Sequence, residues 1–131
     1  DYLVALKWAK GLGGRKALIA RAEANAKAVR DFIATRDWIA DLAEDPATAS
    51  TTSVCLKFTD PRIKDAAAFA KAVAKRLEKE GVALDAGAYR DAPPGLRIWC
   101  GSTVETSDVE ALLPWIEWAF EAEIEAQAVA A

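Results

Sequence analysis

The chain contains no histidine and no methionine among its 131 residues, and only two cysteines. Without histidine, the usual general base and the commonest zinc ligand are missing, which excludes serine–histidine and cysteine–histidine catalysis and predicts no metal site. Two cysteines, Cys55 and Cys100, are too few for a secreted disulfide scaffold, and both lie in strand-like segments. We therefore predict two reduced, buried thiols in a cytoplasmic protein.

A basic surface is missing as well. The net charge of −3 offers no attraction for nucleic acid or for an anionic membrane. No apolar run approaches the roughly 20 residues of a membrane helix, and no signal peptide is visible. A hydrophobic content of 53% predicts a packed globule, and the length fits one domain over residues 1–131. Because the sequence lacks a start residue and opens inside a helix-like pattern, we expect a piece of a longer protein.

Hydrophobic periodicity predicts four helices and three short strands. The α+β order predicts a small, mostly antiparallel or mixed sheet of three to four strands, backed by helices on one face, with the other face left for a partner domain. For Trp38-Ile39, the sequence does not decide between a short strand and a continued turn. The predicted helices are 1–11, 15–35, 65–80 and a last one from Ser107, and the predicted strands are 53–59, 82–85 and 96–101.

The most informative stretch places Arg90 and Arg97 on either side of Pro93-Pro94-Gly95. Fully extended, the two arginines would lie roughly 23 Å apart. The prolines fix φ and the glycine can adopt a positive φ, so we predict a tight reversal that brings both guanidinium groups to one pocket. Arginine binds carboxylate or phosphate through two hydrogen bonds, which indicates an anion clamp. The spacing alone is also compatible with an alternative, in which both arginines are ordinary surface residues, each paired with a carboxylate or with no partner.

The strand that contains Arg97 supports part of this interpretation. Alternation along 96–101 sends Leu96, Ile98 and Cys100 to one face and Arg97 and Trp99 to the other. We therefore expect Arg97 to leave the core and to point toward a cleft or solvent.

The segment 89–101, Tyr-Arg-Asp-Ala-Pro-Pro-Gly-Leu-Arg-Ile-Trp-Cys-Gly, resembles the C-terminal substrate-binding segment of phosphoserine aminotransferases, which are pyridoxal-phosphate enzymes of serine biosynthesis. The likeness extends to 1–14, the helix after it, 52–60 and 79–120, and so covers essentially the whole chain. It implies the C-terminal small domain of a fold-type I aminotransferase whose large domain is absent. In the intact enzyme, an amino group would pass between glutamate/2-oxoglutarate and 3-phosphohydroxypyruvate/O-phosphoserine.

The resemblance also implies roles for three residues. Arg97 corresponds to the arginine that holds the α-carboxylate of the substrate. Arg90 corresponds to the arginine that binds the phosphate of phosphoserine or the side-chain carboxylate of glutamate. Many family members have His-Arg where this chain has Tyr89-Arg90, and tyrosine can donate a hydrogen bond but adds no charge. The contact of Tyr89 with phosphate is therefore left open, and a different acidic substrate is conceivable.

No catalytic or cofactor-binding residue can be assigned in this chain. In the family, pyridoxal phosphate is bound to a lysine of the large domain, and no lysine here has such a context. The glycines at 11, 13 and 14 follow a helix and not a strand, so they do not form a phosphate-binding loop. We expect the isolated chain to be inactive and the intact enzyme to be a homodimer. Two alternatives stay open: a free-standing amino-acid-binding module without catalysis, and the small domain of another class V aminotransferase.

Overall fold

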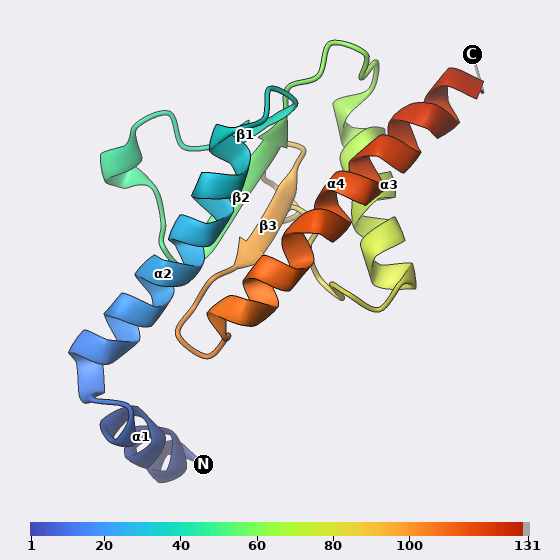
Figure 1. Ribbon diagram of the computed structural model, residues 1–131. Helices are drawn as coiled ribbons and strands as arrows, with labels where there is room; N and C mark the ends of the chain where they lie inside the picture. Colours follow the sequence, from blue (N-terminus) through green and yellow to red (C-terminus); the bar gives the residue numbers. More distant parts are fainter. Residues whose placement is uncertain (130–131) are drawn as a thin grey trace.

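The computed structural model describes residues 1–129 and contains one three-stranded sheet with helices packed on it. The sheet order is β1-β2-β3, and both strand pairs are antiparallel. In Figure 1, α4 runs between α2 and α3, in agreement with its contacts to both. The predicted α+β fold is confirmed. The elements are α1 (Tyr2–Gly11), α2 (Gly14–Ala34), β1 (Ile39–Asp41), the short 3₁₀ helix η1 (Pro46–Thr48), β2 (Ser53–Phe58), α3 (Ala66–Lys79), β3 (Leu96–Trp99) and α4 (Thr106–Val129).

Local signals set the ends of the first and third helices. The Asp1 and Asp65 carboxylates accept hydrogen bonds from backbone N–H groups in the first turns of α1 and α3. These caps satisfy donors that have no partner inside the helix. Gly81 has φ of 71° directly after α3, in the left-handed region that favours glycine at a helix end. The helix boundaries therefore follow the sequence closely.

One predicted strand is not formed, and the last helix starts one residue earlier than predicted. Segment 82–85 is not a strand, because only Ala86 and Gly87 reach the edge of β3, where Gly87 forms an isolated bridge with Leu96. The last helix begins at Thr106, one residue before the predicted start at Ser107.

The core lies between the sheet and three helices. Val54 and Leu56 of β2 are buried on the helix side, as are Leu96 and Ile98 of β3. The opposite face carries side chains that are half-buried or exposed: Ser53, Cys55, Lys57, Arg97 and Trp99. Alternation along β3 is thus as predicted, and Arg97 points away from the core. The hydrophobic core also includes aromatic residues from four segments: Phe32, Trp38, Phe69 and Phe120.

The two thiols differ in their surroundings. Cys100 is buried, and burial raises the pKa of its thiol to about 11, so it stays protonated at neutral pH. Cys55 is only half-buried, contrary to the prediction, because it lies on the outer face of β2. Both cysteines are free.

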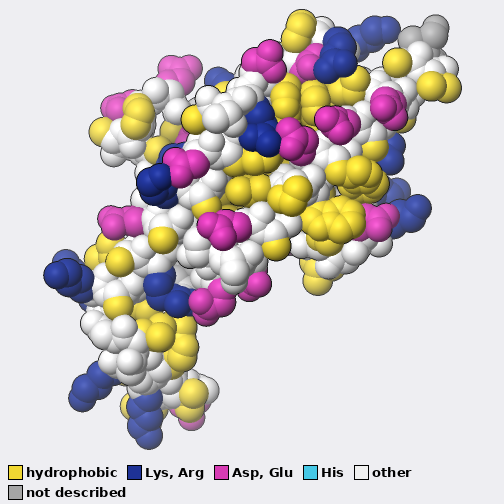
Figure 2. Space-filling model, in the orientation of Figure 1, with side chains coloured by type: hydrophobic (Ala, Val, Ile, Leu, Met, Phe, Trp, Pro, Cys, Tyr) yellow, Lys and Arg dark blue, Asp and Glu magenta, His cyan; other side chains and the backbone are white. Residues whose placement is uncertain are grey.

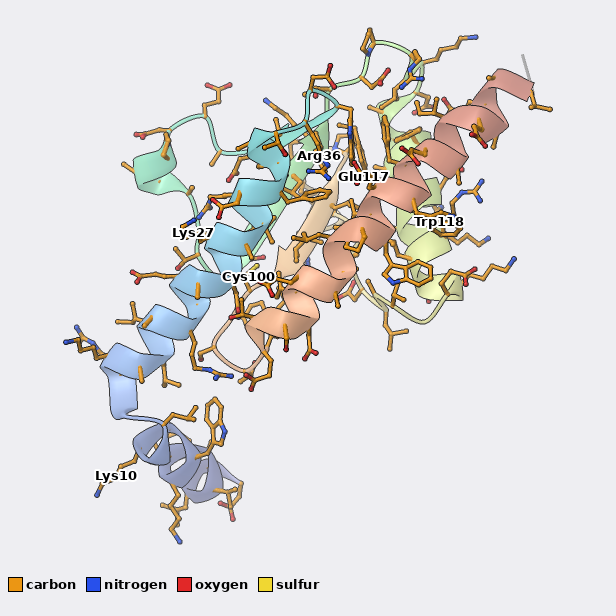
Figure 3. The ribbon with its side chains drawn as sticks, viewed as in Figure 1. Lys10, Lys27, Arg36, Cys100, Glu117 and Trp118 are labelled. Atoms are coloured by element: carbon orange, nitrogen blue, oxygen red, sulfur yellow. The ribbon has the colours of Figure 1, made fainter. Side chains whose placement is uncertain are left out.

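A paired arginine and glutamate connect the end of α2 to α4. Arg36 donates from Nε and Nη2 to the two carboxylate oxygens of Glu117, both at 2.9 Å, and its guanidinium lies 3.7 Å above the Phe32 ring. Figure 3 shows the Arg36 and Glu117 side chains pointing toward one another across the gap between the helices. Hydrogen bonding to Arg36 lowers the pKa of Glu117 from its ordinary value of 4.5.

Replacing Glu117 with glutamine is expected to lower the free energy of unfolding of the chain by about 0.5–1 kcal/mol at pH 7. A lowered carboxyl pKa stabilises the fold above the unfolded-state value and loses that effect as pH falls through the folded-state value. The difference between wild type and Glu117→Gln should therefore persist from pH 7 down to about pH 5 and shrink below pH 4.5. Urea unfolding at several pH values measures it, with Glu121→Gln on the exposed side of α4 as the control. A difference that stays constant to pH 3.5 would contradict the assignment.

Among residues 1–129, no helix has the length and apolar character needed to cross a membrane. The same residues contain no group of three or more side chains placed to ligate a metal ion.

Candidate carboxylate-binding site

A cavity of about 420 Å³ opens beside the edge strand of the sheet. Its walls come from segment 82–86, from β3 and from the first turns of α4. The lining is mostly apolar, with Val82, Leu84 and Leu112 among its members, and Arg97 is its only basic residue. An apolar cavity of a few hundred Å³ with few polar groups is typical of a small-molecule site.

The backbone fixes Arg97 at this cavity. In the register of β2 and β3, Arg97 lies opposite Cys55, and its N–H donates to the Ala86 carbonyl at 2.9 Å. Its side chain is 32% exposed, and Nη2 donates to the Asp85 carboxylate at 2.7 Å. The Nε atom is buried and has no hydrogen-bond partner.

This geometry can bind a carboxylate. A guanidinium offers parallel N–H donors that match the two oxygens of a carboxylate, and such bonds are stronger where water is partly excluded. A buried donor without an acceptor is costly, so an oxygen that reached the Nε–H of Arg97 would gain the bond and remove that cost. The cavity therefore favours an anionic group at Arg97.

The other two predicted site residues lie elsewhere. Tyr89 and Arg90 line a second cavity of about 350 Å³, against Lys71 of α3, and Arg97 is not part of its lining. The Arg90 side chain is 84% exposed, and its Nε lies 3.8 Å from the Asp91 carboxylate. The two arginines thus belong to two separate cavities in this structure.

The predicted reversal is present but is built differently. The chain folds back between Gly87 and Leu96, which form an antiparallel bridge, and a hydrogen-bonded turn spans Tyr89 to Ala92. Gly95 is not among the glycines with positive φ, so the predicted conformational role of this residue was wrong. A Cβ at Gly95 would lie 1.8 Å from the Leu56 carbonyl oxygen. Glycine is needed there because the loop passes directly over the central strand.

One residue that supports the site was not predicted from the sequence. Asn25 of α2 is fully buried, and its amide donates to the carbonyls of Cys100, Gly101 and Val104. Its oxygen accepts from the Thr106 hydroxyl at 2.6 Å. Asn25 therefore fixes the loop between β3 and α4, which supplies part of the cavity wall.

The first cavity does not fit pyridoxal phosphate. No lysine lines it that could form a Schiff base with the cofactor. Lys71 in the second cavity lies on the exposed side of α3, without the burial that commonly activates a Schiff-base lysine. Neither of these two cavities thus offers a buried lysine for the cofactor.

The arrangement of sheet and helices matches a part of solved aminotransferase structures. A phosphoserine aminotransferase from Bacillus circulans subsp. alkalophilus matches with a TM-score of 0.74 at 20% identity, over 88% of this chain and 30% of that chain. A phosphoserine aminotransferase structure concerned with radiation damage of the Schiff base gives a TM-score of 0.72 at 19% identity, with the same coverage. At such identities these likenesses establish the fold.

Sequence comparison gives the particular family. Phosphoserine aminotransferases of Methanosarcina barkeri and Methanosarcina mazei are 48% identical over 122 residues and 46% identical over 123 residues, respectively. Each match covers 92% of this chain and 31% of the relative, so the chain spans about a third of the length of the curated relatives it matches. No family model matches the chain. The chain is thus similar to the phosphoserine aminotransferases over a segment of about a third of their length.

Proposed function

We propose that this chain, over residues 1–131, is the substrate-binding small domain of a phosphoserine aminotransferase. The full-length protein would transfer an amino group between glutamate/2-oxoglutarate and 3-phosphohydroxypyruvate/O-phosphoserine, in the cytoplasm. The relatives at 46–48% identity support the enzyme class. The observation that carries the role of this chain is Arg97, fixed on β3 at a largely apolar cavity with a buried Nε–H that has no acceptor.

In this proposal, Arg97 binds the α-carboxylate that every substrate of the reaction has. The pairing with β2 holds the arginine backbone in place, so little further ordering is needed when the anion binds. A carboxylate held by two bonds has a fixed direction, which orients the α-carbon of the amino acid toward the reacting centre. Pyridoxal phosphate would be held by the part of the relatives that this chain does not cover, and it supplies the electron sink.

Tyr89 and Arg90 are proposed to contact the second anionic end of the substrate, either phosphate or the glutamate side-chain carboxylate. Their separate cavity means that this contact needs a different arrangement of the loop 88–95 from the present one. The exposure of Arg90, at 84%, leaves its side chain room to move. Tyr89 would donate one uncharged hydrogen bond.

The experiment that tests the function is a transamination assay of the full-length protein with glutamate and 3-phosphohydroxypyruvate. Turnover that requires pyridoxal phosphate supports the proposal, and its absence contradicts it. The cavity at Arg97 is formed entirely by this chain, which favours a second candidate, a binding module that works without catalysis. Calorimetry with phosphoserine and glutamate on the isolated chain separates the two: strong binding by the chain alone supports the module, and none supports a half-site.

We further propose that α1 packs against the large domain of the full-length protein, which would form a homodimer. No residue of α1 is buried, even though several of its side chains are large and apolar. Leu3 and Val4 are 65% and 64% exposed, and Trp8 is 42% exposed. Figure 2 shows hydrophobic side chains gathered over α1 and the start of α2, away from the sheet. An apolar helix face of this kind is typical of an interface.

Amide hydrogen exchange checks the position of α1. The backbone amides of Tyr2–Gly11 are expected to exchange at least tenfold more slowly in the full-length protein than in the isolated chain, because packing suppresses opening of the helix. The amides of α3, which is packed in the core of this chain, serve as the control and should change much less. Equal exchange of α1 in both proteins contradicts the interface. Light scattering on the full-length protein tests the dimer.

A further inference from the structure

Arg97 already binds a carboxylate of its own chain. Its Nη2 donates to Asp85 Oδ2 at 2.7 Å, and Asp85 comes from the wall of the same cavity. The two partners are held very differently. Arg97 is on a paired strand and is 32% exposed, whereas the Asp85 side chain is 82% exposed on a segment outside any helix or strand. Asp85 is therefore the partner that can leave.

The hydrogen bond to Asp85 uses only one of the donor nitrogens of the Arg97 guanidinium. Asp85 accepts from Nη2 alone, and the Nε–H of Arg97 stays buried without an acceptor. A carboxylate that lay side-on, with one oxygen at Nη2 and the other at Nε, would use both donors. A ligand placed in this way would meet Asp85 at the same Nη2 atom, and two carboxylates brought that close repel one another.

We propose that Asp85 is an internal competitor for the carboxylate site at Arg97, and that its displacement by the substrate sets the affinity for the amino acid. This inference rests on the proposed role of Arg97. Asp85 loses little when it is displaced, because its carboxylate is already mostly in water. Exposed ion pairs are weak, so removing this competitor should tighten binding by roughly two- to fivefold.

The test uses the full-length protein loaded with pyridoxal phosphate and the variant Asp85→Asn. The probe is glutarate, a dicarboxylate without an amino group that cannot be transaminated, and calorimetry measures its Kd. We expect the Kd for glutarate and the KM for glutamate to fall roughly two- to fivefold. Asp85→Ala, which also removes the hydrogen-bond acceptor, should give at least as large a change. A Kd that is unchanged or higher in both variants overturns the proposal, because Asp85 would then be neutral or would position Arg97.

Glu110→Gln is the matched control. It removes one exposed negative charge near the start of α4 without changing the lining of the cavity. An equal gain in glutarate affinity from Glu110→Gln would mean a general effect of net charge and would overturn the competition. Failure of the proposed function can be told apart from failure of the competition. Wild-type protein that binds glutarate but catalyses no transamination refutes the proposed enzymatic function, and the Kd values of the Asp85 variants still test the competition. Wild-type protein that binds no glutarate refutes both.

Discussion

Replacing Arg97 with alanine in the full-length protein is expected to lower kcat/KM for glutamate by roughly 30- to 900-fold. This corresponds to about 2–4 kcal/mol for a two-bond contact with a charged group at a partly enclosed site. The variant leaves no buried charge behind, because the partner carboxylate of Asp85 is 82% exposed and becomes hydrated. The loss therefore measures the contact with the substrate.

Arg97→Lys is the control for charge alone. Lysine keeps the positive charge but not the planar pair of donors, so its kcat/KM should lie between those of wild type and Arg97→Ala. Steady-state kinetics with glutamate measures both variants, and thermal unfolding verifies that they fold. Wild-type kcat/KM in folded Arg97→Ala protein would refute the assigned role.

The direction of Arg97 could be predicted from the sequence, whereas its separation from Arg90 could not. Side-chain alternation along a strand is a property of the backbone itself, so the outward direction of Arg97 on β3 follows from its neighbours. The place of Arg90 depends on how the loop 88–95 packs against α3, about 20 residues earlier in the chain. A proline–proline–glycine sequence indicates that the chain turns, but it does not fix the path of the loop.

The structural role of Asn25 could have been predicted from the sequence. It lies in the buried stripe of α2, with Ala22, Ala26 and Val29 at helical spacing around it. A polar amide at such a position must find partners inside the protein, which marks it as a structural hydrogen-bonding residue. Which carbonyls it contacts is decided by the loop between β3 and α4, 75 to 79 residues away.

Replacing Gly95 with alanine is expected to destabilise the isolated chain by about 3 kcal/mol, which corresponds to a fall of roughly 10 °C in Tm. A Cβ at this position would lie 1.8 Å from the Leu56 carbonyl oxygen and 3.0 Å from its carbon. Both are backbone atoms of the central strand, paired on both sides, so neither can move without disturbing the sheet. The loop must therefore shift away from β2.

Gly87→Ala provides the matched control, since it makes the same change at the other end of the same loop. No atom lies within 4 Å of a Cβ built at Gly87, and its φ is not positive. Its stability should stay within about 1 kcal/mol of wild type. Urea unfolding of both variants measures the difference, and equal stability would contradict the close approach of loop and strand. Because Gly95 lies two residues before Arg97, the same shift should also lower kcat/KM in the full-length protein, which links the packing of this loop to the carboxylate site.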